Sequence, residues 1–280
     1  MAQSKEFQRY RIKEKLRSVA SYMDVYLAEQ QGLERAVELR ILSRPVKEDS
    51  AEYRRFRREL RLLATLDHPC IIQVLDLGCH ANRLFYTTPY RNAKSVEELL
   101  VETGIPFGER ETIELALQIG DALRYMHENT LLHRNISTKT VFYDLDNLRP
   151  YIADFVTLKA SSEGGLSKSE IPFVYDSFFT PEQIFDQRLD ERTDLYLLGA
   201  ALYRLLTLQN PFEKKDLLRS NLESAFSIEA PSKFNSKISS ELEAIVMKLL
   251  EQAAENRYQG AEELLSALDD SKYSLKEKRQ

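Results

Sequence analysis

The stretch that decides the fold runs from Leu131 to Val156 and reads LLHRNISTKTVFYDLDNLRPYIADFV. It combines short apolar runs with polar, turn-forming residues, a pattern that predicts two short strands joined by a turn. The segments on either side of this strand pair are predicted to be loops, and they carry His133-Arg134-Asn135 and Asp154-Phe155-Val156. Functional side chains are often held on loops that a rigid scaffold positions, so these two loops are the first candidates for a functional site.

The composition is that of an ordinary globular protein. The 280 residues are 43% hydrophobic and 30% charged, enough for one large domain or for two lobes with separate cores. The formal net charge of −5 argues against general nucleic-acid binding. Cys70 and Cys79 lack metal-ligand spacing and, with a polar N-terminal segment that is no secretory signal, favour a cytoplasmic location. The longest apolar segment, residues 195–206, is too short for a membrane span, so no membrane insertion is expected.

Periodicity divides the chain into a strand-rich part and a helical part. Alternating apolar and polar residues predict five strands, at residues 10–16, 24–29, 36–42, 71–77 and 84–88. Helical periodicity predicts helices at residues 48–66, 109–128, 194–208 and 255–268, and Ser240-x-x-Glu243 reads as a capping box that opens one more helix.

Four further motifs accompany the two central loops. They are Leu66-Asp67-His68-Pro69, Thr180-Pro181-Glu182, Asp194-Leu195-Tyr196-Leu197-Leu198-Gly199 and Glu255-Asn256-Arg257-Tyr258. With the central loops, their order and spacing resemble those of protein kinases, especially bacterial serine/threonine kinases of the eukaryotic-like type. The resemblance covers about residues 10–268. It implies an α+β, bilobal protein kinase-like fold, with a five-stranded N-lobe that carries one regulatory helix and a mainly helical C-lobe.

The resemblance also implies a domain organisation. Residues 1–270 are expected to form a single protein kinase-like domain, followed by a charged tail at residues 271–280. Within the domain, the N-lobe is placed at residues 8–90, the hinge at residues 89–93 and the C-lobe at residues 94–270. Asp194 is expected to anchor the loop that carries His133, and Glu182 is expected to pair with Arg257.

The phosphate-covering loop of the family is altered. Kinases have a glycine-rich turn there, because glycine lets backbone N–H groups approach phosphates closely. Residues 17–23 contain no glycine. An ordinary hairpin is therefore expected, and the alternative is a modified loop that still binds phosphate through Arg17 and Ser18.

The third strand departs from the family at two positions. Arg40 replaces the family's lysine, and its planar fork favours carboxylate over point contact with phosphate. A structural ion pair between Arg40 and Glu59 of the regulatory helix is therefore expected. Glu38 replaces the small residue that roofs the adenine, and its carboxylate would disfavour a nucleotide by desolvation and repulsion.

The catalytic and metal loops depart further. Asn135 replaces the catalytic aspartate and cannot take a proton at neutral pH. Ser137 replaces a lysine, and Thr140 replaces the metal-binding asparagine. Asp154 remains as a magnesium carboxylate, while Val156 replaces a glycine and resists a positive φ.

These departures predict a catalytically inactive pseudokinase, which would act as a scaffold or as an allosteric partner in bacterial phospho-signalling. No enzyme activity, catalytic residue, cofactor or metal site is expected, with at most weak ATP binding and no magnesium. A remnant nucleotide and metal pocket would comprise Glu38, Thr88, Pro89, Arg91 and Asp154. The alternative is a residual or atypical serine/threonine kinase, or a nucleotide sensor, that uses Asp154 for metal.

A protein partner is expected, either an active kinase or a phospho-reader domain, whereas the sequence does not indicate an oligomeric state. Regulatory phosphorylation candidates in the predicted activation segment are Thr157, Ser161, Ser162, Ser167, Ser169 and Thr180. The arginine-rich helix near residue 57 could dock an acidic partner or a second copy of the chain, and the alternative is a solvated charged face.

Overall fold

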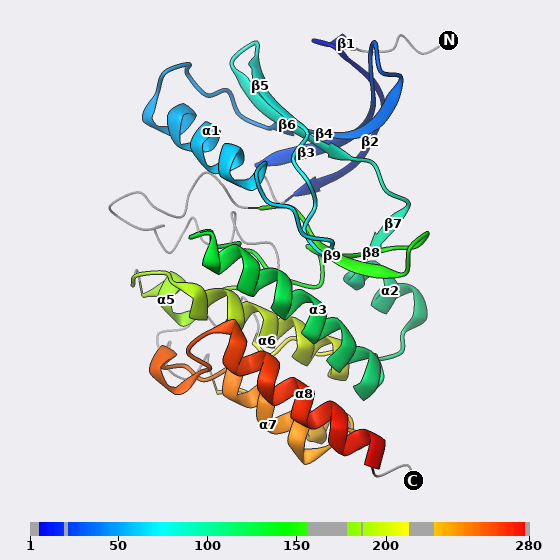
Figure 1. The fold of residues 1–280 in the computed structure, drawn as a ribbon, viewed down its shortest axis with the longest axis vertical. Coiled ribbons are helices and arrows are strands. Elements are labelled where there is room, and N and C mark those ends of the chain that lie inside the picture. The colour runs from blue at the N-terminus through cyan, green and yellow to red at the C-terminus, as the bar shows by residue number, and fades with distance from the viewer. Residues whose placement is uncertain (1–5, 20–21, 156–177, 186, 213–226, 278–280) are drawn as a thin grey trace.

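The computed structural model describes residues 6–19, 22–155, 178–185, 187–212 and 227–277, and it has two differently built ends (Figure 1). The N-terminal end is an antiparallel sheet with one helix packed on it, and the C-terminal end is mainly helical. This arrangement confirms the predicted bilobal, mixed α and β fold.

The N-terminal sheet has six strands in the order β1-β2-β3-β4-β6-β5. They are β1 (Glu6–Phe7), β2 (Tyr10–Val19), β3 (Met23–Gln30), β4 (Arg35–Leu42), β5 (Asp76–His80) and β6 (Arg83–Pro89). The two-residue strand β1 was not predicted. The strand predicted at residues 71–77 is wrong, because β5 begins only at Asp76 and Ile72 instead donates its N–H to the carbonyl of Ile152, 3.0 Å away.

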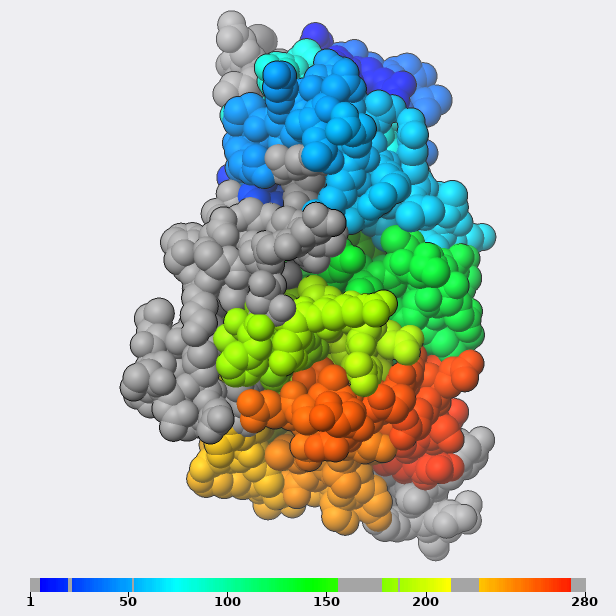
Figure 2. Space-filling view, turned by 90° about the vertical axis from the view of Figure 1, so that its left-hand side faces the viewer, coloured from blue at the N-terminus to red at the C-terminus, as the bar shows by residue number. Residues whose placement is uncertain are grey.

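Helix α1 (Ala51–Leu63) packs its apolar face on this sheet. The Ser50 hydroxyl accepts the N–H of Tyr53 and caps the helix N-terminus. Phe56 is fully buried and lies against Tyr86 of β6, with ring centroids 6.3 Å apart. Figure 2 shows the opposite face of the helix, in blue, on the molecular surface.

A second, three-stranded sheet lies between the N-terminal sheet and the helices (Figure 1). Its order is β7-β8-β9, with β7 (Ala93–Ser95), β8 (Val141–Asp144) and β9 (Arg149–Ile152). Helix α2 (Val96–Thr103), which was not predicted, follows β7 directly and begins with a capping box of Ser95 and Glu98. This sheet and α2 form one wall of the candidate site.

The helical end is built around a buried helix. Its helices are α3 (Glu109–Glu128), α5 (Pro181–Ile184), α6 (Glu191–Thr207), α7 (Ser240–Leu249) and α8 (Ala261–Glu277). Nearly all of α6 is buried, as its apolar sequence predicts. No helix in the described ranges combines the length and the apolar character needed to cross a membrane.

Two predicted details of the helical end are wrong. The cap of α7 is Ser239, because its hydroxyl accepts the N–H of Leu242, while the Glu243 carboxylate accepts the N–H of Ser232 instead of closing a box. Helix α8 begins six residues later than predicted, because residues 254–256 form a 3₁₀ turn, and it continues into the predicted tail.

A buried ion pair confirms the predicted contact between Glu182 and Arg257. The two carboxylate oxygens accept from two guanidinium nitrogens at 2.9 and 3.0 Å, and the side chains are 7% and 0% exposed. The same guanidinium donates to the carbonyl of Arg192 in α6, 3.1 Å away, and lies 4.5 Å from the ring centroid of Tyr196. The pair therefore fastens α5 to α6 and to the segment before α8.

Substitution of one partner should be strongly destabilising. In Glu182→Gln the Arg257 charge stays buried without its counter-charge, so we expect the free energy of unfolding to fall by about 3–5 kcal/mol. Urea unfolding followed by circular dichroism measures this loss. The matched control is Glu102→Gln, because Glu102 and Lys94 form a pair with side chains 53% and 40% exposed. Equal losses in the two variants would contradict a special role for the buried pair.

Candidate active site

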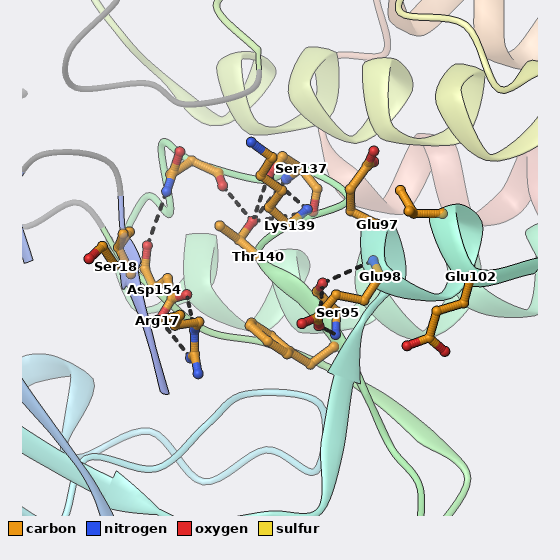
Figure 3. A pocket seen from close by; sticks show the side chains of 14 residues that line it. Arg17, Ser18, Ser95, Glu97, Glu98, Glu102, Ser137, Lys139, Thr140 and Asp154 are labelled. Atoms are coloured by element: carbon orange, nitrogen blue, oxygen red, sulfur yellow. Dashed lines mark hydrogen bonds and ion pairs between the residues drawn. The ribbon is translucent and has the colours of Figure 1, made fainter. Parts of the chain in front are cut away.

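A cavity of about 410 Å³ lies where the end of β2, helix α2, strand β8 and the loop that follows His133 meet (Figure 3). It is lined by Arg17, Ser18, Val19, Ser95, Glu97, Glu98, Val101, Glu102, Asn135, Ser137, Lys139, Thr140, Phe142 and Asp154. Its volume is within the range of roughly 300–1,000 Å³ that is typical of small-molecule sites. Both loops that the sequence singled out contribute to it.

The carboxylate of Asp194 fixes the first loop. It is fully buried and accepts the N–H groups of His133, at 2.9 Å, and of Arg134, at 2.6 Å, which confirms the predicted anchor. Burial raises the pKa of Asp194, but the hydrogen bonds from His127 and from the backbone N–H of Arg134 hold it below its ordinary value. The loop backbone is therefore held by an ionised group inside the helical end.

His133 joins the two loops as a neutral imidazole. Its Nδ1 accepts the N–H of Asn135 at 3.3 Å, and its Nε2 donates to the carbonyl of Ala153 at 3.1 Å. Its ring packs on Phe155, with centroids 4.8 Å apart. Burial lowers the pKa of His133 to about 4, so the ring stays neutral near pH 7.

Polar side chains of the two loops form the floor of the cavity. The Asn135 side-chain nitrogen donates to the carbonyl of Asp154 at 3.2 Å, which leaves the amide oxygen as an acceptor. The Thr140 hydroxyl donates to the carbonyl of Asn135 at 2.6 Å and accepts the N–H of Ser137 at 2.9 Å. Arg134 and Asp154 both have a positive φ, of 63° and 60°, a conformation that is strained in residues other than glycine and persists only where the surrounding structure fixes it.

Four charged side chains form a compact network at the back of the cavity. Arg40 is 1% exposed and forms ion pairs with Glu38, on its own strand, and with Asp154. Arg17 lies 3.4 Å from an Asp154 oxygen (Figure 3), and it forms two hydrogen bonds of 3.2 Å with Glu38. Burial raises the pKa of Glu38, but Arg40 and Arg17 together bring it below its ordinary value. Two carboxylates are thus balanced by two guanidinium groups.

The expected ion pair between Arg40 and Glu59 is wrong. Glu59 accepts from Arg55 at 3.2 Å and lies 3.8 Å from a guanidinium nitrogen of Arg134. The reason is that residues two apart on a strand share a face, so Glu38 is already beside Arg40 when the strand forms. The spacing of Glu38 and Arg40 was a signal for this contact in the sequence.

The predicted remnant pocket is only partly assembled. Of its five residues, Asp154 lines the cavity and Glu38 lies behind it. Thr88 is fully buried and accepts from Arg40 at 3.4 Å, and Pro89 ends β6 opposite Val37. Arg91 lies 3.6 Å from Asp144 and stacks on Tyr151, 4.7 Å from the ring centroid. These contacts hold the predicted hinge without lining the cavity.

The predicted regulatory residues are mostly outside the described part of the chain, as is Val156. These are Thr157, Ser161, Ser162, Ser167 and Ser169. Thr180 is described and is fully buried, and its hydroxyl accepts the N–H of Gln183 and caps α5. This corrects the expectation for Thr180, because a buried cap is not accessible for phosphorylation in this conformation.

Lys139 and Phe142 are among the cavity residues that the sequence analysis did not single out. Lys139 lies on the cavity wall two positions after Ser137, so the loop still brings a lysine to the site. Phe142 of β8 contributes an aromatic face, and the guanidinium carbon of Arg17 lies 4.8 Å from its ring centroid. The lysine could have been found by its proximity in sequence, but the aromatic contact depends on tertiary packing.

The donor set of the cavity is chemically suited to magnesium. Carboxylate, amide and hydroxyl oxygens come from Asp154, Asn135 and Thr140, and Mg²⁺ prefers oxygen ligands and commonly uses one or two carboxylates with phosphate and water. In the described residues no three His, Cys, Asp or Glu side chains cluster into a metal site. A metal here would therefore depend on Asp154, which the two arginines engage in this conformation.

Comparison with known proteins identifies relatives of the whole described fold. A family model described as "Protein kinase domain" matches residues 20–268. A crystal structure of the Mycobacterium tuberculosis PknI kinase domain has a TM-score of 0.75 and 22% sequence identity, and the match covers 96% of this chain and 98% of that one. At this identity the structural similarity supports the fold alone.

Curated relatives are named as serine/threonine-protein kinases. PknB of Mycobacterium tuberculosis is 30% identical over 252 residues, which is 88% of this chain and 40% of PknB. PrkC of Bacillus subtilis is 28% identical over 244 residues, which is 86% of this chain and 37% of PrkC. A probable serine/threonine-protein kinase of Streptomyces coelicolor is 30% identical over 248 residues, or 86% of this chain and 37% of the relative. The chain thus spans about two fifths of the length of these relatives.

These findings overturn the prediction of an inactive scaffold that is not an enzyme. The matching family model is that of a protein kinase domain, and the relatives are named kinases, so the alternative reading fits better. The prediction weighed each altered residue separately. It gave too little weight to what the loops retain, namely the carboxylate of Asp154 and an oxygen-rich floor.

The neutral state of His133 should make stability depend on pH. The pKa of His133 is about 6.5 in the unfolded chain and about 4 in the folded protein. The contribution of the neutral ring to the free energy of unfolding is therefore complete above pH 6.5, and it is lost as the pH falls toward 4. From pH 7 to pH 5 this amounts to about 2 kcal/mol. Urea unfolding at several pH values should show a shallower loss of the free energy of unfolding in His133→Tyr than in the wild type.

His80→Asn, at an exposed histidine, is the control, and its free energy of unfolding should depend on pH as in the wild type. Identical slopes in all three proteins would contradict the assignment.

Proposed function

Because the chain belongs to the protein kinase family, we propose that it is an atypical serine/threonine kinase that phosphorylates a protein substrate with ATP. The observation that carries this proposal is the cavity itself, in which Asp154, Asn135, Thr140 and Lys139 converge from two loops. The names of the relatives support serine or threonine as the acceptor. The activity of any longer protein that contains this chain is part of the same proposal.

Three oxygen-bearing side chains of the cavity floor would hold magnesium. Asp154 would supply the carboxylate, and the amide oxygen of Asn135 and the hydroxyl of Thr140 would complete the protein's share. When bound, magnesium neutralises phosphate charge and orients the nucleotide. This part of the proposal replaces the expectation of no magnesium, which conflicts with the family's normal use of ATP and magnesium.

Asn135 gives the reaction its atypical character. In the transfer, the substrate hydroxyl oxygen forms a bond to the terminal phosphorus while the bond from that phosphorus to ADP breaks. An amide cannot accept the hydroxyl proton, so the proton passes to an oxygen of the transferred phosphoryl group. The Asn135 amide oxygen can still accept a hydrogen bond and orient the hydroxyl. We expect turnover to be lower by roughly 10²–10⁴-fold than with a carboxylate base.

Lys139 would supply positive charge beside the transferred group. It lies on the cavity wall near Asn135, and the family's lysine is replaced by Ser137. The acidic residues of α2, which lies beside the loop that carries Lys139, have other partners as well. Glu97 forms an ion pair with Arg204 at 2.9 Å, and Glu98 is part of the helix cap. Their charges therefore oppose an incoming phosphate less than free carboxylates would.

In this proposal, the main protein partner is the substrate that is phosphorylated. The arginine-rich face of α1 adds a surface for acidic segments of such a partner. A hollow on this face is lined by Asp49, Tyr53, Arg54, Arg57, Arg58, Arg61, Leu62 and Thr65. Four arginines with one acidic residue favour a negatively charged segment over a basic one.

The proposal predicts slow phosphotransfer that depends on Asp154. The purified chain is incubated with γ-labelled ATP, magnesium or manganese, and a generic protein substrate. We expect transfer to serine or threonine in the wild type, and a loss of about 10²-fold or more in Asp154→Asn, because the buried charge that would hold the metal is gone. The control is Asp121→Asn, because Asp121 pairs with Arg124 on α3 outside the cavity. It should keep wild-type activity.

Thermal unfolding with ATP and either metal complements the activity assay. A ligand that binds only the native state raises the melting temperature, by an amount that grows with the logarithm of the ligand concentration above its Kd. A shift without label transfer would replace the kinase proposal with a nucleotide sensor. No shift and no transfer at any metal concentration would reject both.

A further inference from the structure

We infer that the slot between Glu38 and Phe142 is a guanidinium-binding site, which the chain fills with its own Arg17, and that nucleotide enters only when this side chain leaves. The inference rests on the proposed function for the identity of the displaced ligand. It concerns the regulation of the same cavity.

The position of Arg17 is that of a bound planar ligand. Its guanidinium is paired with the Glu38 carboxylate by two hydrogen bonds of 3.2 Å from two different nitrogens. The guanidinium carbon also lies 4.8 Å from the ring centroid of Phe142. Glu38 comes from β4 of the N-terminal sheet and Phe142 from β8 of the second sheet, so the group bridges the two sheets. Fork-like carboxylate pairing and stacking on an aromatic face are the two contacts that a guanidinium makes best.

A β-bulge aims Arg17 into the slot. The register of β2 against β3 shifts between Lys15, opposite Tyr26, and Arg17, opposite Val25. Val25 belongs to the apolar core beneath the sheet, whereas Tyr26 packs with the cluster on the other face. Without the bulge, residues 15 and 17 would share a face. With it, Lys15 lies outside, 2.7 Å from Asp24, and Arg17 points toward the cavity.

Arg17 is the member of the charge network that can leave. Its side chain is 27% exposed, against 1% for Arg40, 9% for Glu38 and 3% for Asp154. Arg40 contacts both carboxylates, so it continues to compensate them when Arg17 moves out. The departing guanidinium is rehydrated, and Arg40 remains as the shared counter-charge in contact with both carboxylates.

A nucleotide base and the Arg17 guanidinium compete for the same surface. Both are planar, and both would stack on Phe142 beneath Glu38, the position that roofs adenine in the resemblance to kinases. Occupation by Arg17 therefore lowers the apparent nucleotide affinity by the fraction of molecules in which the slot is open. This differs from the alternative that Arg17 anchors phosphate, for which its removal would weaken binding.

The test is the affinity for a fluorescent ATP analogue, measured by anisotropy with the intact chain. We expect Arg17→Ala to bind the analogue about tenfold more tightly than the wild type, because the closed fraction disappears. Lys15→Ala, on the same strand but the opposite face, should bind like the wild type. Millimolar methylguanidinium should compete with the analogue in Arg17→Ala and restore weak binding. Arg17→Gln serves as a second variant if the alanine variant unfolds.

The outcomes separate this inference from the proposed function. Unchanged or weaker binding in both Arg17 variants would overturn the inference, even if the wild type transfers phosphate. Tighter binding with no phosphotransfer in any variant would support the self-occupied slot and reject the kinase proposal. Tighter binding without competition by methylguanidinium would also overturn the inference, because the slot would then have no preference for a guanidinium.

Discussion

The cleft depends on one electrostatic constraint, namely that two carboxylates buried in a poorly polarisable environment must each have a cation beside them. Glu38 and Asp154 are 9% and 3% exposed, and Arg40 lies between them at 1% exposure. Taking either charge out of water without a partner would cost several kcal/mol. This requirement explains why Arg40 turns toward Asp154, why Glu59 is left to Arg55 and Arg134, and why Arg17 is drawn inward.

The helical end also contains buried carboxylates, and their charges are compensated in a different way. Asp194 is satisfied by backbone N–H groups and a histidine, and Glu182 by an arginine with 0% exposure of its side chain. In neither arrangement is the compensating group exposed enough to move away into solvent alone. In the cleft, the partly exposed side chain of Arg17 can do so. The two ends therefore combine a rigid anchor for the loops with an exchangeable counter-charge at the cavity, as expected for a scaffold that holds a site able to change state.

The sequence predicted the parts of this structure that depend on local pattern or on spaced motifs. Helix α3 lies where its periodicity placed it, and the contacts of Asp194 and Arg257 follow from their motif positions. Local signals failed where tertiary packing decides. The segment at residues 71–75 reads as a strand, but it is a connection between the sheets in which Ile71, Ile72 and Val74 are buried. The activity was also misjudged, because substituted residues were counted as losses without regard to the oxygen donors and the lysine that the folded loop brings together.

The contacts of Arg17 show most clearly what pattern reading cannot supply. A regular strand would place residues 15 and 17 on one face, and both are basic, so the sequence offers no sign that they separate. One bulge sends Lys15 to an exposed pair with Asp24 and Arg17 to a carboxylate 21 residues away along the chain. The glycine-rich turn of the family exposes backbone N–H groups to phosphate. Here the strand before the turn instead presents a side chain that pairs with Glu38 and lies against Phe142. The altered strand and the altered roof are thus compensating changes, and the state of the cleft depends on whether Arg17 or a ligand lies against Phe142.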